Sequence, residues 1–262
     1  MKSVTSYLYA GIIPARYAST RFPGKPLADI IGKPMIQRVY ERASRSLDLV
    51  YVATDDQRIF DTVRNFGGNV IMTSDKHKSG TDRCAEAVSL ICSEKGKEID
   101  IVINIQGDEP FIRPEQIDLL KTCFDDSSVE IATLVRKAEP DEDLFNPNHP
   151  KVVLDVSGNA IYFSRAAIPY IRDSEMSEWN RKHTFYKHIG LYAYKTGILA
   201  QITGLPPGRL EIAESLEQNR WLENGYRIMT AVSRCESICI DTPSDLEKAK
   251  TYITEFDNLS YL

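Results

Sequence analysis

A run of cationic side chains near the N-terminus suggests an anion-binding loop. The stretch IIPARYASTRFPGKPL, residues 12–27, carries Arg16, Arg21 and Lys25 among prolines and a glycine. Prolines lack a backbone donor and restrict the residue before them, so this segment should leave a strand and stay irregular. The three cations are therefore displayed on a loop. Such a loop can hold a phosphate-bearing ligand, whereas a merely solvated loop is the common alternative reading of the same charges.

Two aspartates far apart in the sequence could add a metal ion to this site. Asp108 follows the apolar run IVINI in the motif QGDEP, and Asp241 follows SICI in CIDTP. Each is predicted to end a strand, and ligands of open α/β sheets collect at the carboxyl ends of strands. A single aspartate in such a place is usually a helix cap or a turn residue. Together with the cationic loop, the pair favours a nucleoside triphosphate site, because carboxylate oxygens suit Mg²⁺.

Two common nucleotide-binding motifs do not fit the sequence. Gly24 and Lys25 are followed by Pro26, where a Walker A motif needs Ser or Thr. The glycine-rich dinucleotide fingerprint G-x-G-x-x-G is also missing. The sequence therefore argues against a P-loop NTPase and against a dinucleotide-dependent dehydrogenase.

Alternating strand and helix patterns position these residues. Apolar runs of period two alternate with segments of period about 3.6 through the first half of the chain. Predicted strands cover residues 7–15, 49–55, 69–75, 100–110 and 130–137, and predicted helices cover residues 35–46, 58–68, 82–96 and 113–124. Repeated alternation predicts an α/β fold, with a mostly parallel central sheet flanked by helices.

The pattern changes after residue 145. Residues 151–165 predict a hairpin and residues 188–195 another strand, which indicates an antiparallel insertion over about residues 146–196. The α/β pattern then resumes with a helix over residues 210–225, strands over 227–233 and 237–241, and a closing helix over 243–256. No linker, repeat or low-complexity run interrupts the sequence, so residues 1–262 are predicted to form a single domain.

Composition argues against several classes of protein. Hydrophobic residues make up 42% of the chain and charged residues 26%, as in ordinary globular proteins. No apolar run approaches the roughly 20 residues that span a bilayer, and the N-terminus lacks a signal-peptide pattern, so we expect a cytoplasmic protein without a membrane partner. A net charge of −5 disfavours nucleic acid as a partner. Five scattered cysteines predict free thiols rather than disulfides or a zinc site.

Collinear motifs over roughly residues 8–250 together resemble one enzyme family. Besides the cationic loop, they include VATDD, SGTDR, NIQGDEP, NPNHPKVV, YFSRAAIPY, KHIGLYAY, LEIAESLEQNRWLENG and IDTPSDLEKA. The combination is similar to the 3-deoxy-manno-octulosonate cytidylyltransferases, or CMP-Kdo synthetases. This resemblance implies a Rossmann-like nucleotidyltransferase that transfers CMP from CTP to 3-deoxy-D-manno-octulosonate (Kdo) for lipopolysaccharide synthesis. It also implies Mg²⁺ as cofactor and a homodimer formed through the antiparallel insertion.

The resemblance also implies roles for individual residues. The nucleotide would be bound by Pro14, Ala15, Arg16, Arg21, Lys25, Ser79, Gly80, Thr81, Gln106 and Asp108. Asp108 and Asp241 would hold the metal ion, and Arg16 and Lys25 would complete the catalytic set. The sugar would be bound by Gln106, Arg165, His188, Tyr192, Glu214, Glu217 and Gln218.

The acidic helix predicted over residues 210–225 supports the sugar site independently. Glu211, Glu214 and Glu217 recur at a spacing of three, so like charges on one face oppose helix formation by a few tenths of a kcal/mol per pair. Carboxylates accept hydrogen bonds from polyol hydroxyls, and Arg165 could meet the sugar carboxylate with two hydrogen bonds. The alternatives are a solvated acidic face and, for His188, a core histidine with its hydrogen bonds satisfied.

Two other functions remain compatible with parts of the sequence. A cytidylyltransferase for another acidic sugar, a sialic acid or 8-amino-Kdo, would have a similar nucleotide half. A noncatalytic nucleotide-sensing protein would need no metal pair, so the presence of both Asp108 and Asp241 counts against it.

Overall fold

A computed structural model describes residues 7–18, 22–235 and 239–259, with side chains as far as residue 251. The chain forms two compact units. The parallel unit comprises Tyr7–Ile117 with Ser237–Leu262, and the mixed unit comprises Asp118–Glu236. The sequence predicted one domain with an insertion over residues 146–196, whereas the antiparallel strands belong to this larger mixed unit.

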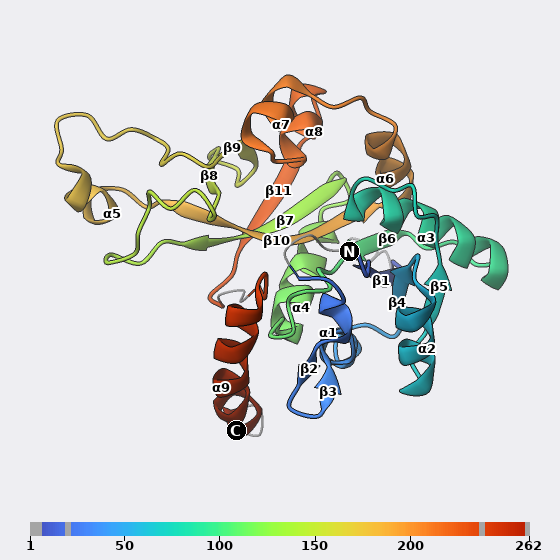
Figure 1. The fold of residues 1–262 in the computed structure, drawn as a ribbon. Helices are drawn as coiled ribbons and strands as arrows, with labels where there is room; N and C mark the ends of the chain where they lie inside the picture. The colour runs from blue at the N-terminus through green and yellow to red at the C-terminus, as the bar shows by residue number, and fades with distance from the viewer. Residues whose placement is uncertain (1–6, 19–21, 236–238, 260–262) are drawn as a thin grey trace. The chain divides into compact units, whose positions relative to one another are not determined.

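Four parallel strands form the centre of the parallel unit. Their spatial order is β6 (Ile101–Asn104), β1 (Tyr9–Ala15), β4 (Val50–Thr54) and β5 (Val70–Met72). β4 and β6 are buried along their whole length, which explains their unbroken apolar sequences. Helices α1 (Met35–Ala43), α2 (Gln57–Asn65) and α3 (Gly80–Lys95) pack around these strands, as Figure 1 shows. The predicted mostly parallel α/β fold is confirmed.

Local caps fix the start of the helices that follow β4 and β5. The Asp56 carboxylate accepts a hydrogen bond from the Arg58 backbone at the N-terminus of α2. Ser79 begins α3 with a capping box, because its hydroxyl accepts from the Asp82 N–H and the Asp82 carboxylate accepts from the Ser79 N–H. The motif SGTDR therefore opens the helix predicted over residues 82–96, which begins two residues earlier than predicted.

The segment before the last helix differs from its prediction. Residues 239–241 form no strand, and residues 237–238 of the predicted strand lie outside the described residues. Ile240 instead donates one backbone hydrogen bond to the Asp108 carbonyl (3.0 Å) and is fully buried among Ile30, Met35 and Phe111. The buried Ile240 side chain on one side and helix α9 (Pro243–Leu259) on the other therefore position Asp241 without a strand.

A short 3-10 turn and a small hairpin complete the parallel unit. Turn η1 (Lys25–Leu27) ends the cationic loop, and strands β2 (Asp29–Ile30) and β3 (Lys33–Pro34) pair antiparallel before α1. α9 contacts β2. Apart from this turn, the described part of residues 12–27 beyond β1 is irregular, as the prolines predicted; Arg21 lies outside the described residues.

The mixed unit combines parallel and antiparallel pairing. β11 (Ile228–Val232) runs parallel to β7 (Ile131–Lys137), whereas β10 (Tyr186–Lys195) runs antiparallel to β7 and β8. β8 (Lys151–Leu154) and β9 (Ala160–Ser164) form the hairpin predicted over residues 151–165. The remaining elements are η2 (Cys123–Asp125), η3 (Met176–Glu178), α5 (Trp179–Lys182) and α6 (Thr196–Thr203), while α4 (Pro114–Thr122) spans the boundary between the units.

The helix predicted over residues 210–225 is wrong, because two shorter helices occupy this segment. α7 (Arg209–Glu214) and α8 (Gln218–Glu223) are separated at Ser215, whose φ of 51° is left-handed. The Arg165 side chain donates to the carbonyls of Glu214 (2.7 Å) and Ser215 (3.3 Å). Those carbonyls would accept intrahelical bonds in a continuous helix, so Arg165 stabilises the break.

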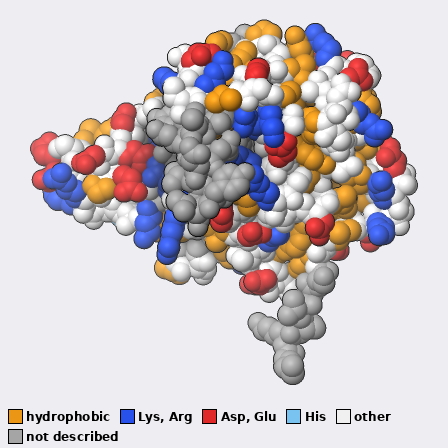
Figure 2. Space-filling view, turned by 90° about the horizontal axis from the view of Figure 1, so that it is seen from below, with side chains coloured by type: hydrophobic (Ala, Val, Ile, Leu, Met, Phe, Trp, Pro, Cys, Tyr) orange, Lys and Arg blue, Asp and Glu red, His pale blue; other side chains and the backbone are white. Residues whose placement is uncertain are grey.

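The surface carries charges of both signs. On the face drawn in Figure 2, Lys and Arg side chains are interspersed with Asp, Glu and hydrophobic groups. Among the described residues, no helix is both long and apolar enough to cross a membrane. All five cysteines are free thiols, as predicted.

Candidate active site

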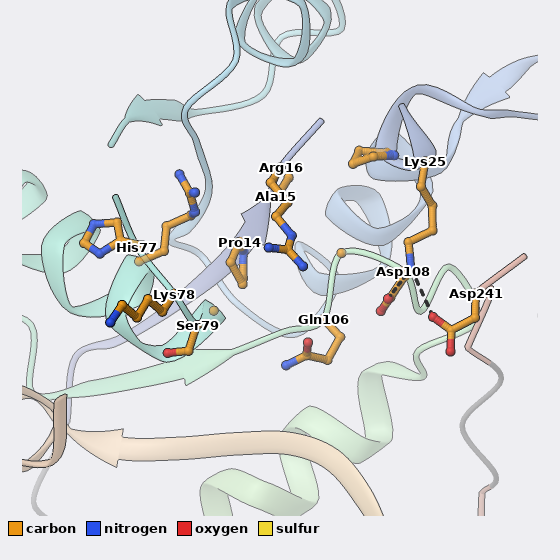
Figure 3. A pocket seen from close by; sticks show the side chains of 14 residues that line it. Pro14, Ala15, Arg16, Lys25, His77, Lys78, Ser79, Gln106, Asp108 and Asp241 are labelled. Atoms are coloured by element: carbon orange, nitrogen blue, oxygen red, sulfur yellow. Dashed lines mark hydrogen bonds and ion pairs between the residues drawn. The ribbon is translucent and has the colours of Figure 1, made fainter. Parts of the chain in front are cut away.

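The candidate nucleotide site is a cavity of about 290 Å³ in the parallel unit. Its wall is formed by the end of β1, the turn η1, the start of α3, the loop after β6 and Asp241, two residues before α9 (Figure 3). Of the residues predicted for the nucleotide and the metal, nine line it: Pro14, Ala15, Arg16, Lys25, Ser79, Gly80, Gln106, Asp108 and Asp241. Thr81 is instead buried within α3 and is not part of the wall.

Lys25 lies between the two predicted metal ligands. Its ammonium nitrogen is 2.6 Å from a carboxylate oxygen of Asp108 and 3.3 Å from one of Asp241 (Figure 3). Burial lowers the pKa of Lys25, but the charge and the hydrogen bond of Asp108, together with the charge of Asp241, more than offset this and leave the pKa raised. The structure thus brings together three residues that lie 216 positions apart at most.

The acidic pair fits a hard divalent cation. Ligand atoms of Asp108, Asp241 and Cys239 all lie within 4.8 Å of one another, and the two carboxylates already share one cation, the Lys25 ammonium. Two carboxylates facing a single ammonium leave an excess negative charge. Mg²⁺ prefers oxygen ligands, so the aspartates suit it and the thiol of Cys239 does not.

Two glycines allow the backbone to close around the end of β1. A Cβ atom at Gly107 would lie 2.9 Å from the Pro14 carbonyl oxygen, and one at Gly80 would lie 3.2 Å from the Pro14 ring. A side chain at Gly107 would therefore force backbone to move. The motifs QGDEP and SGTDR supply glycine at these two close approaches, which brings the starts of both segments to the cavity wall.

At the end of the cavity away from Asp108, the wall includes His77 and Lys78, which were not predicted as site residues (Figure 3). Arg83, which was not predicted either, also lines the cavity. Arg83 is buried, with hydrogen bonds to Thr73 (2.6 Å) and Asp55 (2.7 Å). His77 pairs with Glu86, whose carboxylate also accepts from a backbone N–H. In the sequence only its position in the motif SGTDR points to Arg83, because its partners Thr73 and Asp55 come from other segments.

The cavity is locally cationic in an acidic protein. Arg16, Lys25, Lys78 and Arg83 line its wall, against two carboxylates, so the lining carries an excess of two formal positive charges. The whole chain has a net charge of −5. An anion is therefore attracted to this cavity by groups arranged locally and not by the overall charge of the protein.

The residues predicted to bind the sugar, except Gln106, belong to the mixed unit. His188 and Tyr192 are neighbours on β10, with ring centroids 5.2 Å apart. Burial lowers the pKa of His188 to about 3, and its ring lies 3.2 Å from the Thr133 hydroxyl. Burial likewise raises the pKa of Tyr192 well above its ordinary value. His188 is thus a neutral, largely enclosed imidazole.

Arg165 and Glu214 are engaged in contacts within the mixed unit. The Glu214 carboxylate accepts hydrogen bonds from the Ser164 hydroxyl (2.6 Å), the Arg165 backbone (2.9 Å) and the Tyr162 hydroxyl (3.3 Å). Burial raises the pKa of Glu214, but these hydrogen bonds more than offset it and leave the pKa lowered. The Arg165 guanidinium donates to three carbonyl oxygens, those of Glu214, Ser215 and Pro147. Both residues therefore hold the α7–α8 break in place.

Gln218 retains unused hydrogen-bonding capacity near the break. Its side chain is 5% exposed, and its amide nitrogen has no hydrogen-bond partner among the described residues. The indole nitrogen of Trp221, one turn further along α8, likewise has no hydrogen-bond partner among the described residues. Glu217 is paired with Arg220 at 2.8 Å. The predicted row of three like charges on one helix face is therefore wrong, because the helix breaks and Glu211 and Glu217 both pair with Arg220.

Comparisons with known proteins agree on one family. A family model described as cytidylyltransferase matches residues 10–228. A protein of Parabacteroides distasonis named 3-deoxy-manno-octulosonate cytidylyltransferase is 60% identical over 249 residues, which cover 94% of this chain and 98% of that protein. A protein of Bacteroides thetaiotaomicron with the same name is 56% identical over 248 residues, covering 94% of this chain and 98% of its own length.

A solved structure supports the same assignment. The structure of CMP:2-keto-3-deoxy-manno-octonic acid synthetase complexed with CTP is 42% identical to this chain, with a TM-score of 0.85. The match covers 95% of this chain and 99% of that one.

Proposed function

Because the chain belongs to the 3-deoxy-manno-octulosonate cytidylyltransferase family, we propose that it transfers CMP from CTP to Kdo, giving CMP-Kdo and pyrophosphate. The anomeric hydroxyl of Kdo attacks the α-phosphorus of CTP and loses its proton. The bond from that phosphorus to the bridging oxygen breaks, and pyrophosphate leaves. The observation that carries this proposal is the cationic cavity with Lys25 held between Asp108 and Asp241.

The residues of the cavity suit the charge that this reaction handles. Arg16 and Lys25 come from one loop and would contact the phosphates, so that binding and orientation supply much of the catalysis. Asp108 and Asp241 would hold Mg²⁺, which when bound neutralises phosphate charge and the leaving pyrophosphate. Gln106, Ser79 and Gly80 would border the nucleotide from two other segments.

Residues of the mixed unit would bind the sugar. Gln218 has the best support, because its buried amide nitrogen has no hydrogen-bond partner in the part of the chain that the structure describes, and a buried polar group without a partner is unfavourable. His188 and Tyr192 offer polar atoms in the same unit, and the Tyr192 ring contacts Trp221 of α8. Glu214, Glu217 and Arg165 would have to share hydrogen bonds that they already make, so we assign them a weaker direct role.

The proposed function also suggests a cellular setting and an assembly. CMP-Kdo is an activated form of Kdo, and we propose that it supplies Kdo for lipopolysaccharide synthesis in the cytoplasm, where CTP is made. We also propose a homodimer formed through residues 146–196, on the resemblance of this insertion to the family's dimerisation element. Light scattering that gives the mass of two chains would support the dimer, and the mass of one chain would contradict it.

The decisive experiment is pyrophosphate release from CTP with different acidic sugars. Purified enzyme with Mg²⁺ should release pyrophosphate in proportion to added Kdo, and CMP-Kdo should accumulate. N-acetylneuraminate and 8-amino-Kdo at equal concentration should give much slower release. No release with any sugar, despite CTP binding, would favour a nucleotide sensor, and faster release with another sugar would change the proposed substrate.

A further inference from the structure

The cationic loop is closed by Tyr17, a residue outside the cavity wall. Tyr17 follows Arg16 directly, and its carbonyl accepts a hydrogen bond of 2.9 Å from the Gly24 N–H, immediately before Lys25. Gly24 has a φ of 73°, and a Cβ atom there would lie 3.1 Å from the Tyr17 ring. Only glycine fits both the left-handed backbone and this close contact. The backbone next to Arg16 and the backbone next to Lys25 are therefore joined by the Tyr17–Gly24 hydrogen bond.

Helix α2 supplies a cation that holds the Tyr17 ring. The central carbon of the Arg58 guanidinium is 3.3 Å from the centroid of the ring. Arg58 is in turn fixed by Asp56, through hydrogen bonds from Nε (3.0 Å) and Nη2 (2.6 Å). The hydrogen bonds from Arg58 hold the pKa of Asp56 below its usual range. Asp56, Arg58, Tyr17 and Gly24 thus form a connected series from α2 to the residue before Lys25.

From these contacts we propose that Tyr17 and Arg58 are positioning residues, which set the affinity for the nucleoside triphosphate by placing Arg16 and Lys25. This inference rests on the proposed function. None of Tyr17, Gly24, Arg58 and Asp56 lines the cavity, so they act through residues that do. Arg16 and Lys25 flank the two ends of the Tyr17–Gly24 hydrogen bond, and a change at Tyr17 displaces both cations together.

The geometry around Lys25 explains why this support matters. Its ammonium reaches two carboxylates at 2.6 Å and 3.3 Å, so a shift of the loop alters both ion pairs. The other described backbone hydrogen bonds here join near neighbours: Lys25 to Phe22, Leu27 to Gly24 and Ala28 to Lys25. Among those described, only the bond between Gly24 and Tyr17 spans the loop. A loop with several prolines has few other backbone donors to fix its position.

The test compares ring and cation variants with a matched control. Tyr17→Leu removes the ring, Tyr17→Phe keeps it, and Arg58→Ala removes the cation. Arg64→Ala removes an exposed arginine from the same helix and serves as the control. An exposed cation–π contact is worth about 0.5–1 kcal/mol, so Arg58→Ala should weaken CTP binding about 2- to 5-fold.

Two readouts separate positioning from a general loss of structure. Calorimetric titration with CTP and Mg²⁺ should show the weakening without any sugar, and steady-state assays should show a higher KM for CTP with kcat within about twofold. Tyr17→Leu should have the largest effect, roughly 10-fold, with Tyr17→Phe close to wild type. In Tyr17→Leu, the further change Arg58→Ala should have little effect, because the ring that Arg58 contacts is gone.

The outcomes distinguish this inference from the proposed function. CTP affinity in Tyr17→Leu and Arg58→Ala equal to that of Arg64→Ala would overturn the inference. A fall in kcat with unchanged CTP affinity would also overturn it. If Tyr17→Leu fails to fold, Arg58→Ala carries the test, because its side chain is 60% exposed. Wild-type enzyme that binds CTP but releases no pyrophosphate with Kdo would refute the proposed function alone.

Discussion

Replacing Lys25 by methionine tests the charge balance of the cavity. The substitution keeps most of the aliphatic length but removes the ammonium that faces Asp108 and Asp241. Two carboxylates within 4.8 Å of each other would then repel without compensation. Coulomb's law gives about 1 kcal/mol for this separation in bulk water and about 3 kcal/mol at an effective dielectric constant of about 20.

Solvent exposure selects the lower part of that range. The side chains of Asp108 and Asp241 are 25% and 38% exposed, so water screens part of the repulsion. We therefore expect Lys25→Met to lower the free energy of unfolding by about 1–2 kcal/mol without divalent cations. For a chain of this size the thermal midpoint should fall by roughly 2–8 °C.

Circular dichroism during heating, in the presence of a chelator, measures this change. Lys33→Met is the matched control, because Lys33 pairs with Glu41 at the surface and its loss should have a smaller effect. Adding Asp241→Asn to Lys25→Met should restore most of the lost stability by removing one of the two repelling charges. Mg²⁺ should raise the midpoint of Lys25→Met more than that of the wild type. The reasoning is refuted if the double variant is no more stable than Lys25→Met.

Four further predictions concern turnover, specificity, pH and the sugar. Asp108→Asn and Asp241→Asn should each lower kcat by orders of magnitude with folding intact. The double variant should have a kcat little lower than that of the less active single variant. Near-normal turnover in Asp241→Asn would remove Asp241 from the site. CTP should be preferred over UTP and ATP by orders of magnitude, because the wrong base leaves buried polar groups unpaired. Comparable turnover with UTP or ATP at equal concentration would contradict CTP as the substrate. His188 is neutral in the folded protein, with a pKa of about 3 against about 6.5 unfolded, so the unfolded chain binds more protons between these values. Stability should then fall as pH decreases from about 6.5, and less steeply in His188→Gln, as urea titrations at several pH values will show. Arg165→Ala should weaken sugar binding in calorimetry while CTP binding is retained. It should also lower the thermal midpoint of unfolding, because three carbonyls lose their hydrogen-bond donor. Unchanged sugar affinity would leave Arg165 a purely structural role.

Local sequence patterns predicted the strands and helix starts of the parallel unit well, because residues close in the sequence determine these features. The apolar runs of β1, β4 and β6 are buried on both faces, and the caps at Asp56 and Ser79 lie directly before their helices. The cationic loop was also predictable, since prolines and Gly24 restrict its backbone wherever it lies. These features depend on near neighbours in the sequence.

The misplaced elements depend on contacts between distant residues. The break at Ser215 is held by Arg165, 50 residues earlier, and no periodicity within residues 210–225 reports that contact. Residues 239–241 of the strand predicted over 237–241 form no strand for a related reason, because an apolar run can also place a single buried side chain in the core, as it does for Ile240. Arg83 was missed because its partners Asp55 and Thr73 come from other segments.

Lys25 connects the cationic loop with the acidic pair, and its protonation constrains how the site can respond to pH. Burial would lower its pKa, yet Asp108 and Asp241 leave the pKa above the ordinary value of 10.5. The stabilising effect of this ion pair is therefore fully present below pH 10.5 and is lost only as the pH rises through the higher folded-state value. The ammonium keeps its charge throughout the neutral range, so the two carboxylates always face a cation when no metal is bound. Any dependence of activity on pH near neutrality must then arise from a group other than Lys25.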